Sequence, residues 1–186
     1  MASHLCTIRF FAQSIFSIEE FIMLQKVRTE LQPDTLIHNL TTTVHAGVAE
    51  LDAPARDVWN IVGRFDGYNR FVTGLEYIQM TGTATGPRSL RHKHFTGGDL
   101  VVEQLNTRDD DAMTMSWTLI YTTFDIGNMW ASMEVVPRGD KACTATYRIV
   151  GEARSGNPKD QPAFDAFAVG FLKMAMDNLR KMFNGA

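Results

Sequence analysis

The chain has 186 residues and a formal net charge of −3, and 45% of its residues are hydrophobic while 21% are charged. These values are typical of a soluble globular protein with one well-buried core, and the length leaves room for an extension. No long basic cluster is present, which argues against a nucleic-acid partner. No apolar run approaches the roughly 20 residues of a membrane-spanning helix, so no integral membrane association is expected.

The two cysteines, Cys6 and Cys143, form neither a CxxC pair nor a Cys/His spacing typical of a zinc site. No nucleophile elbow, glycine-rich phosphate loop or dinucleotide fingerprint occurs either. We therefore expect no disulfide framework, no metal and no cofactor, and the predicted location is a reducing cytoplasm.

Residues 1–39 differ from the rest of the chain and are predicted to form an N-terminal helical extension. Apolar residues recur at three-to-four spacing from Phe11 to Ile22, which predicts an amphipathic helix over residues 10–31. Such a helix needs a surface to cover it, and the candidates are the rest of the chain, a second subunit in a homodimer, or a membrane surface. The first two are favoured. Met23 is an alternative start of the natural chain.

Residues 40–186 are predicted to form the second domain, which opens with a strand and a short helix. Residues 41–50 alternate in polarity and contain β-branched residues, as strands do. Asp52 is expected to cap the following helix, with Pro54 in its first turn. A second short helical piece is expected over residues 68–72.

The region from Leu75 to Ala153 has no strong helical period. Strand-like runs alternate there with turn signals, and the short connections predict an antiparallel meander. The acidic run from Asp109 to Asp111 is interpreted as a solvated hairpin tip. The six predicted strands lie within residues 75–82, 88–95, 99–108, 112–123, 128–138 and 141–153.

The chain ends in a long amphipathic helix that begins near Pro162. A seven-stranded sheet would leave one apolar face bare, and this helix is long enough to cover it. A twisted sheet that curls round one helix leaves a cavity, and the twelve Phe and ten Met residues suit its lining as well as an ordinary core. The fold class predicted from the order of elements is α+β.

Three segments carry a resemblance to a known family. They are ELDAPARDVWNIVGRFDGYNRF, GPRSLRHKHFTGGDLVVEQL and ASMEVVPRGDKACTATYRIVGEA. In this order they resemble the START and birch-pollen-allergen (SRPBCC) superfamily, and most closely its bacterial polyketide cyclase/dehydrase-like branch, over residues 40–184. The family often has Trp where this chain has Tyr147. The resemblance implies a helix-grip fold, in which a curved seven-stranded antiparallel sheet wraps around the last helix and a pocket lies between them.

Side chains alternate between the two faces of a strand. The resemblance extends to plant hormone receptors whose matching arginine face points inward, which implies that Arg91, Lys93 and Phe95 face the pocket. His92 and His94 then lie on the solvent face, and a metal site there is the less favoured interpretation. The same argument places the following side chains inward: Val101, Glu103, Leu105, Trp117, Leu119, Trp130, Ser132, Glu134, Ala145, Tyr147 and Ile149 on later strands, and Phe164, Phe167 and Phe171 on the last helix.

The few polar groups in this set allow two interpretations. In the functional one, Arg91 or Lys93 anchors a carboxylate, phenolate or enolate oxygen, Glu103 acts as a general base if burial raises its pKa, and Tyr147 donates to a carbonyl. In the structural one, Arg91 and Glu103 form an ion pair that only holds adjacent strands together.

Members of the superfamily bind lipids, sterols, hormones or polyketide-like molecules, and only some are enzymes, so the fold does not decide the activity. The first hypothesis is a carrier or sensor that binds an apolar or amphipathic small molecule, with Lys93, Phe95, Trp117, Trp130, Phe164, Phe167 and Phe171 as ligand-binding residues. The alternative is a cyclase or dehydrase that uses Glu103, Arg91 and Tyr147. A third hypothesis is an interaction protein that assembles through the N-terminal helix.

Overall fold

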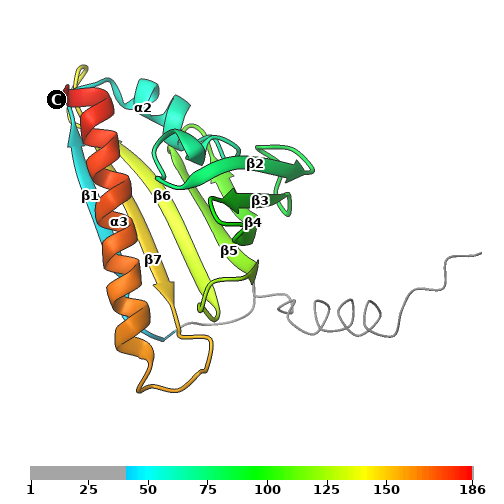
Figure 1. Cartoon of the computed structure of the whole chain (residues 1–186). Coiled ribbons are helices and arrows are strands. Elements are labelled where there is room, and N and C mark those ends of the chain that lie inside the picture. Colours follow the sequence, from blue (N-terminus) through cyan, green and yellow to red (C-terminus); the bar gives the residue numbers. More distant parts are fainter. Residues whose placement is uncertain (1–40, 186) are drawn as a thin grey trace, which may run out of the picture. The chain divides into compact units, whose positions relative to one another are not determined.

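The computed structural model describes residues 41–185, and Figure 1 shows how their helices and strands are arranged. The helix expected over residues 10–31, its partner surfaces and the start at Met23 all lie outside the described residues and stay predictions.

Seven antiparallel strands form one sheet, in the order β1-β7-β6-β5-β4-β3-β2. Strands β2 to β7 are a meander of sequential neighbours, and β1 pairs with β7, the last strand of the chain. The predicted helix-grip architecture is confirmed. The strands are β1 (His45–Leu51), β2 (Leu75–Thr81), β3 (Leu90–Phe95), β4 (Leu100–Asp109), β5 (Thr114–Thr122), β6 (Met129–Pro137) and β7 (Cys143–Gly151).

Three helical elements accompany the sheet: α2 (Ala55–Val62), the 3₁₀ turn η2 (Tyr68–Arg70) and the long α3 (Gln161–Asn184). The expected cap of α2 is wrong in detail, because Pro54 itself occupies the N-cap position. The backbone amide of Asp52 is held at 3.0 Å by the side chain of Asn184 at the far end of α3. Among the described residues, no helix is long and apolar enough to cross a membrane.

Helix α3 lies along β1 and β7 on the concave side of the sheet (Figure 1). Gly47 of β1 allows a close approach, because a Cβ atom there would lie 2.9 Å from Met176 and 3.0 Å from the Leu172 side chain. The last turns of α3 also bind the β1 backbone, since the side chain of Arg180 donates to the carbonyl of Val48. Side chains of α3 thus cover backbone groups on the edge strand β1, where open groups would invite further strand pairing.

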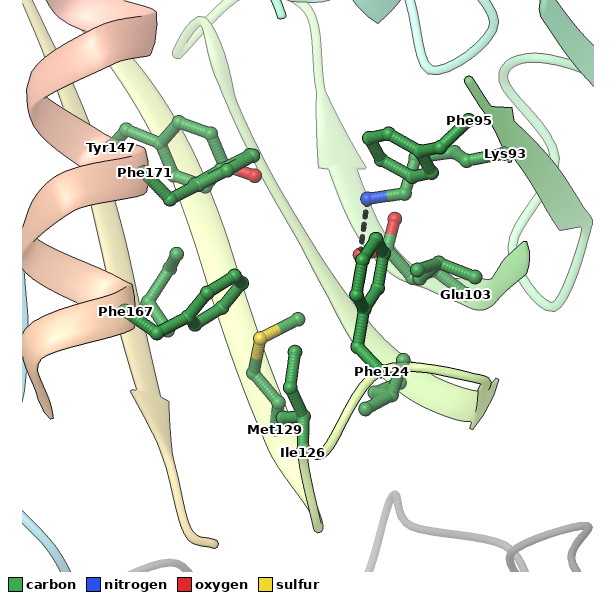
Figure 2. A pocket seen from close by; sticks show the side chains of 12 residues that line it. Lys93, Phe95, Glu103, Phe124, Ile126, Met129, Tyr147, Phe167 and Phe171 are labelled. Carbon is green, nitrogen blue, oxygen red and sulfur yellow. Dashed lines mark hydrogen bonds and ion pairs between the residues drawn. The ribbon is translucent and has the colours of Figure 1, made fainter. Parts of the chain in front are cut away.

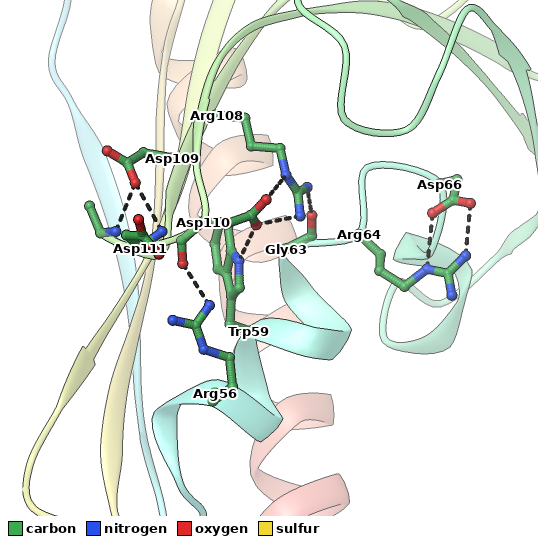
Figure 3. A network of polar contacts seen from close by, with 10 residues as sticks. Arg56, Trp59, Gly63, Arg64, Asp66, Arg108, Asp109, Asp110 and Asp111 are labelled. Atoms are coloured by element: carbon green, nitrogen blue, oxygen red, sulfur yellow. Dashed lines mark hydrogen bonds and ion pairs between the residues drawn. The ribbon is translucent and has the colours of Figure 1, made fainter.

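The turn between β4 and β5 holds α2 in place (Figure 3). Asp109 accepts hydrogen bonds from two backbone amides of this turn, as expected for a hairpin tip. Asp110 does more than face solvent, because it accepts the indole N–H of Trp59 at 2.7 Å and pairs with Arg108 at 2.6 Å. Hydrogen bonds from Arg108 and then Trp59 lower the pKa of Asp110. One end of the sheet is therefore closed by α2.

Candidate functional site

A cavity of about 60 Å³ lies between α3 and the concave face of the sheet. Figure 2 shows that its wall is built from β3, β4, the loop between β5 and β6, and α3, with β7 behind. Most of this wall is aromatic or aliphatic. The lining residues are Lys93, Phe95, Val101, Glu103, Leu119, Phe124, Ile126, Met129, Tyr147, Ile149, Phe167 and Phe171.

The cavity is small for the size of ligand that the family resemblance implies. Sites that enclose a drug-sized molecule have roughly 300–1,000 Å³, whereas this cavity has about 60 Å³. In this conformation, the cavity therefore has room for only a small part of a molecule of that size.

The polar end of the cavity is formed by Lys93 and Glu103. Arg91 and Glu103 stand directly opposite each other on β3 and β4. The guanidinium of Arg91 donates from Nε to one Glu103 oxygen at 2.6 Å, and the ammonium of Lys93 donates to the other at 2.9 Å. All three side chains are buried. One carboxylate is therefore shared by two cations.

Burial and charge act in opposite directions on these groups. Burial alone would raise the pKa of Glu103, but Arg91 and Lys93 outweigh it and hold the pKa below its usual value. Burial lowers the pKa of Lys93 to about 8, although Glu103 opposes this. Glu103 is therefore held ionised, and Lys93 loses its proton more readily than an ordinary lysine.

Arg91 points inward but does not reach the cavity. Its guanidinium carbon lies 4.1 Å from the ring centroids of both Phe65 and Tyr68, and 4.7 Å from that of Trp117. It also donates to the carbonyl of Phe65 at 3.1 Å. These rings come from α2–η2 and β5, and Arg91 is buried among them with no exposed surface. Arg91 therefore does not line the cavity as the resemblance implied, and the expected Arg91–Glu103 pair is present.

Tyr147 of β7 contributes a hydroxyl to the cavity wall. Its ring packs edge-on against Trp117 at 5.5 Å and against Phe171 at 5.8 Å. Figure 2 shows the hydroxyl pointing into the cavity, on the opposite side from Lys93. Burial raises the pKa of Tyr147 well above its ordinary value, so the hydroxyl stays protonated and is a hydrogen-bond donor at neutral pH.

The structure brings six of the ten predicted site residues to the cavity wall and leaves four elsewhere. Lys93, Phe95, Glu103, Tyr147, Phe167 and Phe171 line the cavity.

Besides Arg91, the residues that do not line it are Trp117, Trp130 and Phe164. Trp117 is fully buried and in contact with Arg91. Phe164 is buried with its ring against Gly151, and it lines a separate hollow.

The inward face of β6 is the opposite of the one expected. The residues of β6 that are buried alternate from Met129 through Met133 to Val135, so Trp130 lies on the outer face. On that face Glu134 pairs with Arg148 of β7 at 2.9 Å. Alternation defines two faces but not which of them is inward, and here the strand pairing decides it, because Ala131 stands opposite the inward Trp117 of β5.

The cavity also contains residues that the sequence argument assigned to a turn. Phe124 and Ile126 belong to the FDIG break between β5 and β6, and both line the cavity. A large aromatic and a branched aliphatic residue inside a short turn are the signal that would have identified them, since turns are usually polar.

The histidines of β3 lie on its outer face. The ring of His94 stacks on Tyr77 at 4.3 Å, and His92 is hydrogen-bonded to Thr81 at 3.2 Å. Within residues 41–185 no three His, Cys, Asp or Glu side chains come together as the ligands of a metal would.

Comparison with known proteins agrees with this fold. A structure from Thermobifida fusca has 26% sequence identity and a TM-score of 0.65, and the match covers 75% of this chain and 91% of that one. The Zhui aromatase/cyclase from a Streptomyces species has 13% identity and a TM-score of 0.59 over 75% and 92% of the two chains. A norcoclaurine synthase from Thalictrum, solved with a transition-state analogue, has 16% identity and a TM-score of 0.57 over 77% and 95%.

The last two resemblances show the fold alone. No protein of curated function matches the sequence. The family model described as polyketide cyclase/dehydrase and lipid transport matches residues 39–183, which is most of the chain. The order of strands, the long final helix and the cavity between them agree with that match, and the chain belongs to the polyketide cyclase/dehydrase and lipid transport family.

Proposed function

We propose that the protein binds an apolar or amphipathic small molecule, such as a lipid or a polyketide-like compound, and acts as its carrier or sensor. The observation that carries this proposal is the cavity itself, which has one charged end and otherwise apolar walls. A few placed polar groups within an apolar lining are the usual composition of a small-molecule site. The family description, which includes lipid transport, supports the same assignment.

The charge at the polar end indicates which part of the ligand binds there. With Lys93 protonated, the group formed by Arg91, Glu103 and Lys93 carries two positive charges and one negative charge. An unbalanced buried charge is unfavourable, and an anionic oxygen from a ligand would neutralise it. The ligand therefore places a carboxylate, phenolate or enolate at Lys93. The Tyr147 hydroxyl lies on the opposite side of the same cavity.

Binding of decanoate and of its methyl ester tests this assignment by calorimetry at pH 7. The carboxylate is expected to bind at least about tenfold more tightly, because a hydrogen bond to a charged group contributes about 1.5–3 kcal/mol. Lys93→Met should abolish the difference. Lys173→Met is the matched control, since Lys173 is exposed on α3 and pairs with Asp177.

Equal affinity for acid and ester in the natural chain would contradict the role of Lys93. Native mass spectrometry of protein from its source organism is a second test. A co-purifying small molecule is expected, and well-folded protein that carries none would count against a carrier.

A cyclase or dehydrase activity is the alternative function, and the environment of Lys93 is the observation that supports it. Glu103 is bound by two cations and has a lowered pKa, so it is a weak base. Lys93, with a pKa of about 8, is the better candidate to remove a proton, and Tyr147, which lines the same cavity, would donate to a developing oxyanion. In this mechanism Lys93 is the general base. The sequence suggested Glu103 for that role, together with Arg91 and Tyr147.

Cyclisation of a 1,5-diketone probe tests the enzyme alternative. Its rate should rise with pH through about 8, the pKa of Lys93, and fall to the uncatalysed level in Lys93→Met. A rate that is unchanged in this variant would remove the basis for the alternative.

We also propose the location and the assembly that the sequence suggests. A reducing cytoplasm fits the low cysteine content. A homodimer through the helix expected over residues 10–31 is tested by comparing the mass in solution of the full chain with that of a chain starting at Met23. A dimer that becomes a monomer on shortening supports this assembly, and equal oligomeric states contradict it.

A further inference from the structure

A second hollow adjoins the cavity on its outer side. It has a volume of about 280 Å³ and lies between the β5–β6 loop and the first turns of α3. We call it the outer hollow, and it is lined by Phe124, Asp125, Ile126, Ala153, Ser155, Asp160, Ala163, Phe164 and Phe167.

Three side chains belong to the walls of both spaces: Phe124, Ile126 and Phe167. Phe124 comes from the sheet side, where its ring packs edge-on against Phe95 at 5.4 Å. Phe167 comes from the helix side, where it stacks on Phe171 at 6.1 Å. Phe167 is also 39% exposed, which is unusual for a large aromatic that lines an internal cavity. Only side chains therefore separate the cavity from the outer hollow.

The backbone around this partition is well anchored. The side chain of Arg154 donates to the carbonyls of Thr122 and Phe124, and the amide of Gly127 donates to Glu152 at 2.8 Å. A rotation of Phe124 and Phe167 thus breaks no hydrogen bond of the loop, whereas an opening of the whole loop would break several. Rotamer changes of partly exposed side chains are also fast.

Charge differs between the two ends of the combined space. Lys93 lies at the inner end, whereas Asp125 and Asp160 lie at the outer hollow, where Asp160 accepts a hydrogen bond from Ser155 at 2.6 Å. An anionic group is therefore favoured at the inner end and disfavoured at the outer one. Between the two ends the walls are apolar.

We propose that the cavity and the outer hollow are two halves of one binding channel, divided by the side chains of Phe124 and Phe167. The channel binds an amphipathic acid. The anionic head of this acid lies at Lys93, and its apolar body extends between the two rings onto Phe164. This inference rests on the proposed function. It explains how a cavity of about 60 Å³ serves a family whose ligands are much larger, because the outer hollow adds about 280 Å³.

A series of straight-chain carboxylates from hexanoate to tetradecanoate tests the channel by calorimetry on the full chain. A channel predicts that affinity rises about three- to fourfold for each added methylene that is buried, and that it keeps rising to the longer acids. Ala163→Trp fills the outer hollow from an exposed position of α3. This substitution should lower the affinity for tetradecanoate at least tenfold and leave the affinity for hexanoate unchanged. Ala166→Trp, at another exposed position of the same helix outside the hollow, is the matched control and should bind both acids normally.

The outcomes separate this inference from the proposed function. If short acids bind through Lys93, but affinity stops rising with length and Ala163→Trp has no effect on tetradecanoate, the channel is overturned and the proposed function stands. If no acid binds the natural chain, both are overturned. Should Ala163→Trp fail to fold, the length series on the natural chain decides by itself.

Discussion

At the scale of single residues, Arg91 and Lys93 share one carboxylate but have different surroundings. Arg91 is enclosed by three aromatic rings and also binds the Phe65 carbonyl, whereas Lys93 borders the cavity. If Arg91 is removed, the Glu103 oxygen that it binds stays buried without a partner. If Lys93 is removed, the other Glu103 oxygen faces the cavity, which water or a ligand can enter.

Arg91→Met should therefore lower the free energy of unfolding by about 3–5 kcal/mol, the range found when one partner of a buried pair is removed. Lys93→Met should change it by less than about 1.5 kcal/mol, because Arg91 still neutralises Glu103. Urea denaturation measures both. Equal losses in the two variants would show that the aromatic enclosure of Arg91 contributes nothing.

The lowered pKa of Lys93 makes stability depend on pH. The folded-state pKa is about 8 and the ordinary value is 10.5, so between these values the unfolded chain binds more protons than the folded one. Folding stability then rises with pH in this window, and the unfavourable contribution of Lys93 is fully present only below pH 8. Above about pH 10 the buried Tyr68 and Tyr147 lower folding stability as the pH rises. Burial raises their pKa values, so the folded chain keeps these protons longer than the unfolded one.

We expect the difference in unfolding free energy between the natural chain and Lys93→Met to shift in favour of the natural chain by about 2 kcal/mol from pH 7 to 9.5. Denaturation at a series of pH values measures it. A difference that does not vary with pH would mean that Lys93 has an ordinary pKa.

At the scale of elements, the contact between β1 and α3 depends on a residue without a side chain. A Cβ atom at Gly47 would lie 3.2 Å from the Leu172 carbonyl as well as close to two side chains. Backbone cannot yield as the end of a flexible side chain can. Gly170 differs from Gly47, because Gly170 lies inside α3 with nothing within 4 Å of an added Cβ atom.

Gly47→Ala should destabilise the protein by about 1–3 kcal/mol through overpacking. Gly170→Ala should stabilise it by up to about 1 kcal/mol, because alanine is the better helix former. Thermal or urea unfolding of the two variants checks the pair. A neutral Gly47→Ala would show that α3 can move away from β1 at little cost.

The element scale also shows where strand parity fails. The inward faces of β3, β4, β5 and β7 are as expected, and that of β6 is reversed. The pairing register accounts for the reversal, since Ala131 of β6 stands opposite Trp117 of β5 and Ile149 of β7, which both face inward.

At the scale of the whole molecule, the two ends of the described domain meet. Strand β1 pairs with β7 along its whole length, and α3 then packs on β1. The sheet and the core are therefore complete only when the last helix is in place. The side chains of α3 buried by this packing include Ala168, Leu172 and Leu179.

A chain that ends at Asp160 should consequently fail to form a fixed tertiary structure. Without α3 the apolar concave face of the sheet has no cover. Loss of the near-UV circular dichroism signal, with the full chain as reference, would show this. A shortened chain with a native-like signal and a cooperative transition would mean that the sheet is stable by itself.

The sequence alone determined the order of strands and helices, the antiparallel meander and the covering final helix. It could do so because these features follow from local signals: the alternation of strands, the three-to-four spacing of helices and the residues that make turns.

Only the tertiary structure decided which residues a ligand can reach. Arg91 is sealed off because rings from α2–η2 and β5 converge on it, and Trp130 faces outward because the pairing with β5 places its neighbour Ala131 on the inward face. The size of the cavity and the partition at Phe124 and Phe167 depend on how side chains distant in sequence fill one space. Local periodicity carries no information about that packing, because packing is a property of several elements together.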